Sequence, residues 1–202
     1  MLRAHNALIV VQFVSEPAPH TRQAKLIVLD RDGVINYDSE NFIKSPDEWR
    51  PIPGSLEAIA RLNHAGYRIV VATNQSGLGR RFFNMGMLVA INDKMHKALA
   101  QVGGRIDAVF YCPHAADAGC LCRKPKPGML TDIGQRFGVD MTGVPCIGDG
   151  LRDIQAAAAV GAQPILVLTG KGEKTLREGN FPQNTVIFPD LAFAATALLA
   201  GE

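Results

Sequence analysis

Three of the chain's four cysteines and one of its histidines fall in a single short stretch, CPHAADAGCLC, residues 112–122. The pattern is C-x-H-x5-C-x-C, formed by Cys112, His114, Cys120 and Cys122. Thiolate and imidazole are the ligands of closed tetrahedral zinc sites, where Zn–S distances are about 2.3 Å and four protein ligands leave no open position. A redox pair is the other interpretation of clustered cysteines, but its usual C-x-x-C spacing is absent. The stretch therefore predicts a structural zinc site, and Cys146 is expected to be a core residue.

Four aspartates follow two separate apolar runs. Asp30 and Asp32 end the first run, in LIVLDRDGV, and side chains two positions apart in extended backbone point the same way. Two carboxylates held together repel each other unless a cation joins them. Asp149 ends the later run VPCIGDG, and Asp153 stands four positions beyond it. Taken singly, each segment could be a simple turn, with Asp153 an acid that favours the N-terminus of a helix.

Two further segments carry groups that suit anions. TNQSG, residues 73–77, follows the apolar run YRIVVAT and offers a hydroxyl, two side-chain amides and a glycine. RKPKPG, residues 123–128, follows Cys122 directly and brings Arg123 and Lys124. TNQSG alone could be a loop with helix-capping residues. The zinc-bound loop would in turn fix the place of the two cations that follow it.

The elements that must position these groups are predicted from apolar patterning. Continuous apolar runs, typical of parallel strands covered on both faces, indicate strands at 26–29, 67–73, 107–112, 144–148, 163–170 and 185–188. Amphipathic segments between them indicate helices at 55–66, 84–101, 128–137, 152–162 and 191–200. The alternation predicts a doubly wound, Rossmann-like α/β fold, with a parallel sheet, helices on both faces and no large cap domain. Ligands bind beyond the carboxyl ends of such strands, where the four segments above would meet.

Composition restricts the classes of partner and compartment. The 202 residues carry a net charge of +2 and no Lys/Arg tract, which argues against a nucleic-acid partner. The apolar runs are too short to span a membrane, and clustered cysteines without a disulfide framework indicate a reducing compartment, the cytoplasm. Residues 1–24 have a short apolar core interrupted by Gln12 and no A-x-A site, so a peripheral extension is predicted rather than a signal peptide. Residues 25–202 would then form a single domain.

The four segments resemble a known family. DRDGV, TNQSG, the lysine of RKPKPG and GDGLRD stand in the order of the four motifs of the haloacid dehalogenase superfamily of phosphatases, from about Lys25 to Gly170. Within it, DRDGVIN, SPDEW, TNQSGLGR and the CPH…CLCRKPKPGM segment are most similar to phosphatases that act on a heptose bisphosphate. One departure is that such relatives carry a lysine or serine after the motif aspartate, where this chain has Gly150.

The resemblance implies a role for each motif residue. Asp30 is expected to be the nucleophile, forming an aspartyl-phosphate, and Asp32 the general acid and base. Mg²⁺ is expected between Asp30, the main-chain carbonyl of Asp32, and Asp149, with Asp153 either an indirect contributor or only a helix-terminal acid. The transferred phosphoryl group is expected to be held by Thr73 and neutralised by Lys124.

Further residues are expected to bind the substrate. They are Asp38, Asn74, Gln75, Ser76, Arg80 and Arg123. The guanidinium forks of Arg80 and Arg123 suit a second phosphate, although Arg80 and Arg81 could equally form a solvated loop.

The resemblance implies an enzyme that removes the C7 phosphate of a heptose 1,7-bisphosphate in lipopolysaccharide precursor synthesis. A histidinol-phosphate phosphatase is the alternative, because it shares the fold, the four motifs and a similar Cys/His loop. A polynucleotide 3′-phosphatase is more distant, since basic and aromatic stripes are lacking, and a silent zinc or sugar-phosphate binding module would have lost a motif residue. We expect a monomer.

Overall fold

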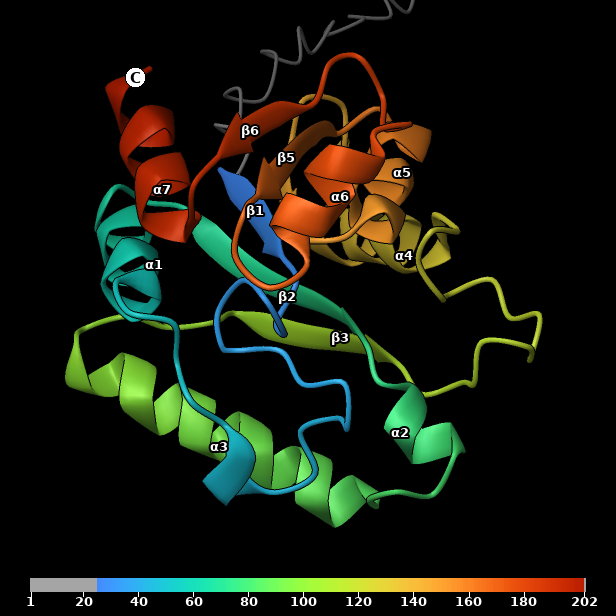
Figure 1. Ribbon diagram of the computed structural model, residues 1–202. Helices are drawn as coiled ribbons and strands as arrows, with labels where there is room; N and C mark the ends of the chain where they lie inside the picture. The colour runs from blue at the N-terminus through green and yellow to red at the C-terminus, as the bar shows by residue number, and fades with distance from the viewer. Residues whose placement is uncertain (1–24, 202) are drawn as a thin grey trace, which may run out of the picture.

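One parallel sheet forms the centre of the molecule, as predicted. The computed structural model describes residues 25–201, so the predicted extension over residues 1–24 lies outside the described part. The six strands are β1 (Leu26–Leu29), β2 (Arg68–Asn74), β3 (Ala108–Cys112), β4 (Pro145–Gly148), β5 (Gln163–Val167) and β6 (Val186–Phe188). They lie in the order β3-β2-β1-β4-β5-β6 (Figure 1). Strand order therefore reverses between β1 and β4, which is where doubly wound folds bind their ligands.

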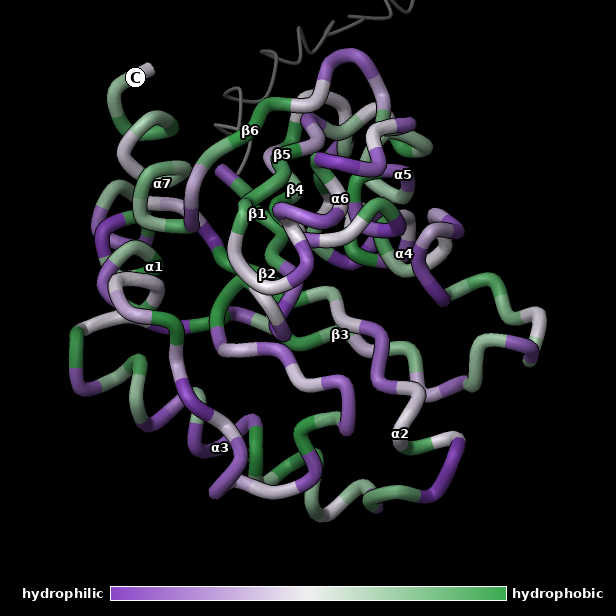
Figure 2. Tube along the Cα trace, viewed as in Figure 1, coloured by the Kyte–Doolittle hydropathy of each residue, from purple (hydrophilic) through white to green (hydrophobic). Residues whose placement is uncertain are grey.

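Burial on both faces explains the apolar runs of the central strands. All four residues of β1 are buried, and Leu29 pairs with Val71 of β2 on one side and with Ile147 of β4 on the other. Figure 2 shows apolar residues concentrated along these central strands. At the end of β1 the chain is still paired, because the amide of Asp30 donates to the carbonyl of Ile147 at 2.8 Å. Asp30 and the end of β4 are therefore held side by side.

Helices cover both faces of the sheet. The main ones are α1 (Ser55–His64), α3 (Met85–Gln101), α4 (Gly128–Phe137), α5 (Leu151–Ala159) and α7 (Leu191–Ala200). The apolar sides of α1, α3 and α7 share one buried cluster with the sheet, and those of α4 and α5 share the other. Figure 1 shows α1 and α7 to the left of the sheet and α4 and α5 to its right. The predicted doubly wound α/β fold is confirmed.

Three short elements were not among the predicted ones. They are the 3-10 turn η1 (Pro46–Glu48) and the helices α2 (Ser76–Gly79) and α6 (Gly172–Glu178). Elements of 3, 4 and 7 residues are too short to show a repeating apolar face. Within residues 25–201 the insertions between strands contain only these elements and the helices above, and no helix there has the length and apolar character to cross a membrane.

Candidate active site and metal centres

Three aspartates meet where β1 and β4 end. One carboxylate oxygen from each of Asp30, Asp149 and Asp153 lies within 4.8 Å of the others, and all three side chains are buried. Asp30 follows β1, Asp149 follows β4, and Asp153 stands in the first turn of α5. The reversal of strand order brings these two strand ends together, so residues more than a hundred positions apart share one site.

This carboxylate cluster fits a divalent cation. Burial raises the pKa of Asp30 to about 6, in spite of the opposing charge of Lys124. Burial, together with the charges of Asp153 and Asp30, raises the pKa of Asp149 to about 7. Oδ1 of Asp149 is buried without a hydrogen-bond partner. The negative charges of these carboxylates are thus only partly compensated by neighbouring cations. Carboxylate oxygens are the hard ligands that Mg²⁺ prefers.

Lys124 supplies the cluster with one positive charge. Its Nζ lies 3.2 Å from Asp30 Oδ1 and 2.6 Å from Asp153 Oδ1, and it donates to the carbonyl of Ala72 at 2.6 Å. Burial alone would lower the pKa of Lys124, but the charges of Asp153 and Asp30 raise it above its ordinary value. The lysine is therefore a fixed cation pointing at the expected nucleophile. Asp153 both pairs with Lys124 and, through Oδ2, accepts from the amide of Gly150 at 3.0 Å.

Asp32 lies beside this cluster in a set of hydrogen bonds. Arg31 donates to both of its oxygens, at 3.0 and 2.9 Å, and Asn36 donates to Oδ1 at 2.9 Å. Gln75 donates from Nε2 to Asp32 Oδ2 at 2.9 Å and to Thr73 Oγ1 at 3.0 Å. Burial alone would raise the pKa of Asp32, but the charge of Arg31 and these hydrogen bonds hold it below its ordinary value. The side chain of Gln75 thus joins Thr73 to Asp32.

A segment after β5 contacts both Asp149 and the loop after β1. Its Lys171 amide donates to Asp149 Oδ2 at 2.8 Å, and its Thr169 hydroxyl donates to the carbonyl of Gly33 at 2.6 Å. Gly170 has a positive φ of 57°, and a Cβ there would lie 2.2 Å from Asp149 Oδ2. Only a glycine fits between the two loops at this point. Such contacts orient a metal-binding carboxylate.

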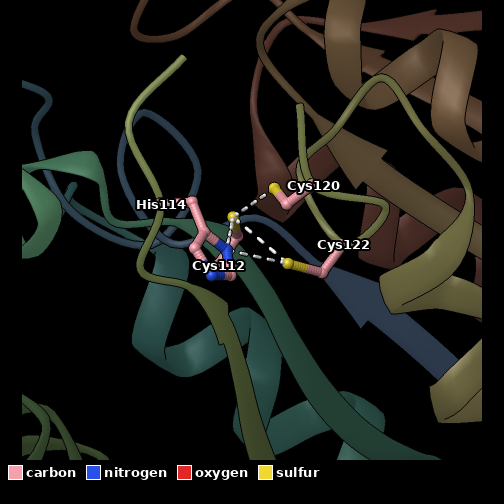
Figure 3. Close-up of side chains that lie close together, drawn as sticks. All are labelled: Cys112, His114, Cys120 and Cys122. Atoms are coloured by element: carbon pink, nitrogen blue, oxygen red, sulfur yellow. Dashed lines mark hydrogen bonds between the residues drawn. The ribbon is translucent and has the colours of Figure 1, made fainter. Parts of the chain in front are cut away.

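The predicted zinc ligands converge. Sγ of Cys112 lies 3.6 Å from Cys120 Sγ and 3.4 Å from Cys122 Sγ, and His114 Nδ1 lies 3.6 and 3.3 Å from Cys112 and Cys122 (Figure 3). Ligand atoms bonded to one tetrahedral zinc stand about 3.5–3.8 Å apart, given Zn–S bonds of about 2.3 Å and Zn–N bonds of about 2.0–2.1 Å. The sulfur distances far exceed the roughly 2.0 Å of a disulfide. The four side chains therefore fit a zinc ion.

The Cys/His loop, residues 112–122, is joined to the loop after β2. The side chain of Asn74 accepts from the Lys124 amide at 3.2 Å and donates to its carbonyl at 3.0 Å. The Gln75 amide donates to the carbonyl of Cys112 at 2.8 Å, and the Gly79 amide to that of Pro113 at 2.9 Å. Asn74 and Gln75 are thus engaged in holding the site together. Cys146 is buried in β4, as expected for a core residue, and is not one of the four converging Cys/His side chains.

The remaining predicted substrate residues surround the site. Arg123 is half-buried and lines a cavity of about 390 Å³ together with Lys124, Lys126 and Arg152. Ser76 opens α2, and Arg80 is exposed just beyond its end. Asp38 forms an ion pair with Lys171, with Nζ 2.5 Å from Oδ2. The basic cavity beside Lys124 has the charge to take a second anionic group.

Three charged residues at the site were not singled out from the sequence. Arg31 is completely buried against Asp32, Lys171 links Asp38 with the loop beside Asp149, and Arg152 lines the basic cavity. Burial lowers the pKa of Arg152, but the nearby charges of Asp153, Asp30 and Asp149 raise it overall. In the sequence, Arg31 and Arg152 could have been found only from their positions within the motifs DRDG and GDGLRD.

Comparison with known proteins agrees with this geometry. A family model described as polynucleotide kinase 3 phosphatase matches residues 25–150, and a HAD-hydrolase-like model matches residues 121–194. A D-glycero-beta-D-manno-heptose-1,7-bisphosphate 7-phosphatase of Bordetella bronchiseptica is 59% identical over 175 residues, which cover 87% of this chain and 98% of that protein. The enzyme of the same name from Pseudomonas aeruginosa is 52% identical, over 86% of this chain and 97% of its own.

Solved structures give the same assignment. The D,D-heptose 1,7-bisphosphate phosphatase of B. bronchiseptica, complexed with magnesium and phosphate, superposes with a TM-score of 0.87 at 58% identity, covering 88% of this chain and 99% of that one. The Burkholderia thailandensis enzyme superposes with a TM-score of 0.71 at 53% identity, covering 87% and 99%. This chain is therefore a phosphoric monoester hydrolase of the haloacid dehalogenase-like superfamily, and it belongs to the same family as the D-glycero-beta-D-manno-heptose-1,7-bisphosphate 7-phosphatases.

Proposed function

We propose that this phosphatase removes the C7 phosphate of D-glycero-beta-D-manno-heptose 1,7-bisphosphate, in lipopolysaccharide precursor synthesis. The observation that carries the proposal is the 59% identity to an enzyme of that name over 98% of its length. The site supports it with two adjacent places for anions, and Lys124 belongs to both. One is the edge where Lys124 faces Asp30, and the other is the cavity lined by Arg123, Lys126 and Arg152.

The chemistry proposed for the chain has two steps. The Asp30 carboxylate attacks phosphorus, the bond from phosphorus to the sugar oxygen breaks, and Asp32 gives its proton to that oxygen. Water then attacks the aspartyl-phosphate, Asp32 takes the proton of the water, and phosphate leaves while Asp30 is restored. Lys124, 3.2 Å from Asp30, and the Thr73 hydroxyl hold the phosphoryl oxygens throughout.

Two metal ions complete the proposal. Mg²⁺ would be held by Asp30, the main-chain carbonyl of Asp32, and Asp149, and it would offset the repulsion between an anionic nucleophile and an anionic phosphate. The magnesium and phosphate in the B. bronchiseptica structure support this assignment. Zinc would be held by Cys112, His114, Cys120 and Cys122 with no position left for substrate, so its role would be structural.

A panel of three phosphate esters tests the substrate. We expect turnover of heptose 1,7-bisphosphate to exceed that of histidinol phosphate and of a 3′-phosphorylated oligonucleotide by at least about a hundredfold. Histidinol phosphate has no second phosphate for the basic cavity, and the chain has no Lys/Arg tract to bind the phosphodiesters of an oligonucleotide. The oligonucleotide is included because the polynucleotide kinase 3 phosphatase model matches this chain. Equal rates on all three esters would contradict the assignment.

The nucleophile is tested by Asp30→Asn, which should lower phosphate release by several orders of magnitude. Asp132→Asn is the matched control, because Asp132 lies on the surface of α4, paired with Arg136. Phosphate release is measured on the heptose bisphosphate in Mg²⁺. Undiminished turnover by Asp30→Asn would show that the proposed mechanism is wrong. Binding of the heptose bisphosphate without turnover by the unchanged protein would favour a silent binding module instead.

A further inference from the structure

Arg31 is a buried cation at the active site for which the reaction just proposed has no use. It stands in sequence between the nucleophile Asp30 and the acid–base residue Asp32, and its side chain has an exposed fraction of 0%. A guanidinium removed from water is costly unless its charge is paired and its N–H groups are bonded. The groups that Arg31 contacts therefore indicate what it does.

Its guanidinium holds both oxygens of one carboxylate. Nε donates to Asp32 Oδ1 at 3.0 Å, and the second terminal nitrogen donates to Oδ2 at 2.9 Å. Two parallel bonds of this kind fix the plane of a carboxylate as well as its position. The other terminal nitrogen lies 3.4 Å from Oδ1 of Asn92 on α3, so the fork is itself held by a helix.

The other donors to Asp32 are neutral. Asn36 donates to Oδ1 and Gln75 to Oδ2, each at 2.9 Å, so the two oxygens together accept four hydrogen bonds. A carboxylate has about four acceptor positions, and here all of them are used. A proton can be carried on Asp32 only where one donor gives way. Charge-assisted bonds are about twice as strong as neutral ones, so an amide gives way before the Arg31 fork.

We propose that Arg31 is a positioning residue for Asp32: it holds the carboxylate in the orientation from which a proton reaches the leaving oxygen and is taken back from water. This inference rests on the proposed function, in which Asp32 is the acid and base. Arg31 itself touches neither Asp30 nor the phosphate-facing Thr73 through its side chain in any of the contacts above. Its effect on catalysis should therefore pass entirely through Asp32.

A double-mutant cycle on the heptose bisphosphate tests that dependence. General acid–base catalysis contributes about 10²–10⁴-fold, so we expect Arg31→Met to lower kcat by about a hundredfold with KM changed by less than about threefold. Arg31→Lys keeps the charge without the fork and should lie in between. In an Asp32→Asn background, Arg31→Met should cost less than about twofold, because the group that it positions no longer transfers protons.

A change of leaving group gives a second readout. A p-nitrophenolate leaves without a proton, and kcat/KM reports the attack by Asp30 but not the later attack of water. Arg31→Met should therefore lower kcat/KM for p-nitrophenyl phosphate by less than about threefold, while kcat/KM for the alkyl ester falls about a hundredfold. A merely structural role would lower both equally. Arg61→Met is the matched control, because the Arg61 guanidinium binds Thr196 and the carbonyl of Ala192 on α7, away from the site. It should leave both rates unchanged.

The possible outcomes distinguish a failure of the positioning role of Arg31 from a failure of the proposed function. Equal losses from Arg31→Met with Asp32 and with Asn at position 32, or equal losses of kcat/KM on the two esters, would overturn the positioning role while leaving the proposed function intact. Full turnover by Asp32→Asn would instead overturn the role of Asp32, and the inference with it. Should Arg31→Met fail to fold because the charge of Asp32 is left without its partner, the cycle is run with Arg31→Lys, Asp32→Asn and their double variant, since lysine keeps a positive charge beside Asp32.

Discussion

At the scale of single residues, the buried carboxyls of Asp30 and Asp149 both have raised pKa values. Their pKa values of about 6 and about 7 lie above the ordinary value of 3.8, because burial and neighbouring carboxylates disfavour the charged forms. A folded protein that binds protons more tightly than its unfolded chain is stabilised at low pH. Without metal, the contribution of these two groups to the free energy of unfolding is complete below pH about 4. It is lost as the pH rises through about 6 to 7.

Magnesium should reverse this dependence. Mg²⁺ is expected to bind the ionised carboxylates, so it has to displace more protons from them at pH 5 than at pH 8. Its apparent affinity should therefore be at least about tenfold weaker at pH 5. We therefore expect Mg²⁺ to raise the melting temperature more at pH 8 than at pH 5, as measured by thermal unfolding with and without the ion. Asp149→Asn should remove most of the difference and Asp132→Asn none of it. An equal rise at both pH values would contradict the assigned cluster.

Residue types at motif positions could be predicted, but their partners could not. Asp30, Thr73 and Asp149 were identifiable because each is a chemically distinctive residue at the end of an apolar run, and Lys124 because it follows the Cys/His stretch. Arg31, by contrast, looks like a solvated loop residue in the sequence, and only the fold shows that it has an exposed fraction of 0%. The sequence also did not indicate that the side chains of Asn74 and Gln75 hold Lys124 and Asp32.

At the scale of elements, two loops far apart in sequence act as one support. The zinc loop after β3 and the loop with α2 after β2 are joined by the bonds of Gln75 to Cys112 and of Gly79 to Pro113. A Cβ on Gly79 would lie 2.7 Å from the carbonyl of Pro113, so the two loops are in close contact. Lys124 follows the last zinc ligand by two positions. We therefore expect the position of Lys124 to depend on the Cys/His loop, residues 112–122, as well as on Asn74.

Loss of one expected zinc ligand should therefore also lower activity at the active site. In Cys120→Ser we expect zinc content to fall well below one per chain and turnover to fall roughly 10- to 100-fold, since a displacement of about 1 Å at a catalytic group can cost that much. Zinc is measured by elemental mass spectrometry and turnover by phosphate release. Cys146→Ala is the control, because Cys146 is buried in β4 outside the cluster, and it should keep its zinc. Full zinc or full turnover in Cys120→Ser would contradict the supporting role.

The long elements could be predicted because they carry a repeating apolar pattern, which a buried strand or an amphipathic helix requires. The helix at 128–137 and the one at 191–200 have the predicted bounds. The short helix α2 has no such pattern, since only Gly77 among its residues is buried. The loop after β5 was also not predicted to reach Asp149, because that contact joins residues 22 positions apart through β4 and β5.

At the scale of the whole molecule, one chain supplies every group of the proposed site. The expected nucleophile Asp30 follows β1, Thr73 is the last residue but one of β2, Asp149 follows β4, and the Cys/His loop begins at the end of β3. These ends lie at one edge of a sheet whose two faces are covered by helices of the same chain. Both hydrophobic clusters that support the proposed site are built from residues of this chain.

A monomer should therefore be fully active. We expect the specific activity on heptose bisphosphate to stay constant when the enzyme is diluted over about three orders of magnitude, because dissociation of an assembly would lower it only if a partner completed the site. Light scattering over the upper part of that range should give the mass of one chain, 21.7 kDa. Substrate and Mg²⁺ are kept saturating, and a carrier protein prevents loss to surfaces. A specific activity that falls with dilution, together with a larger mass at high concentration, would show that the assembly contributes to the site.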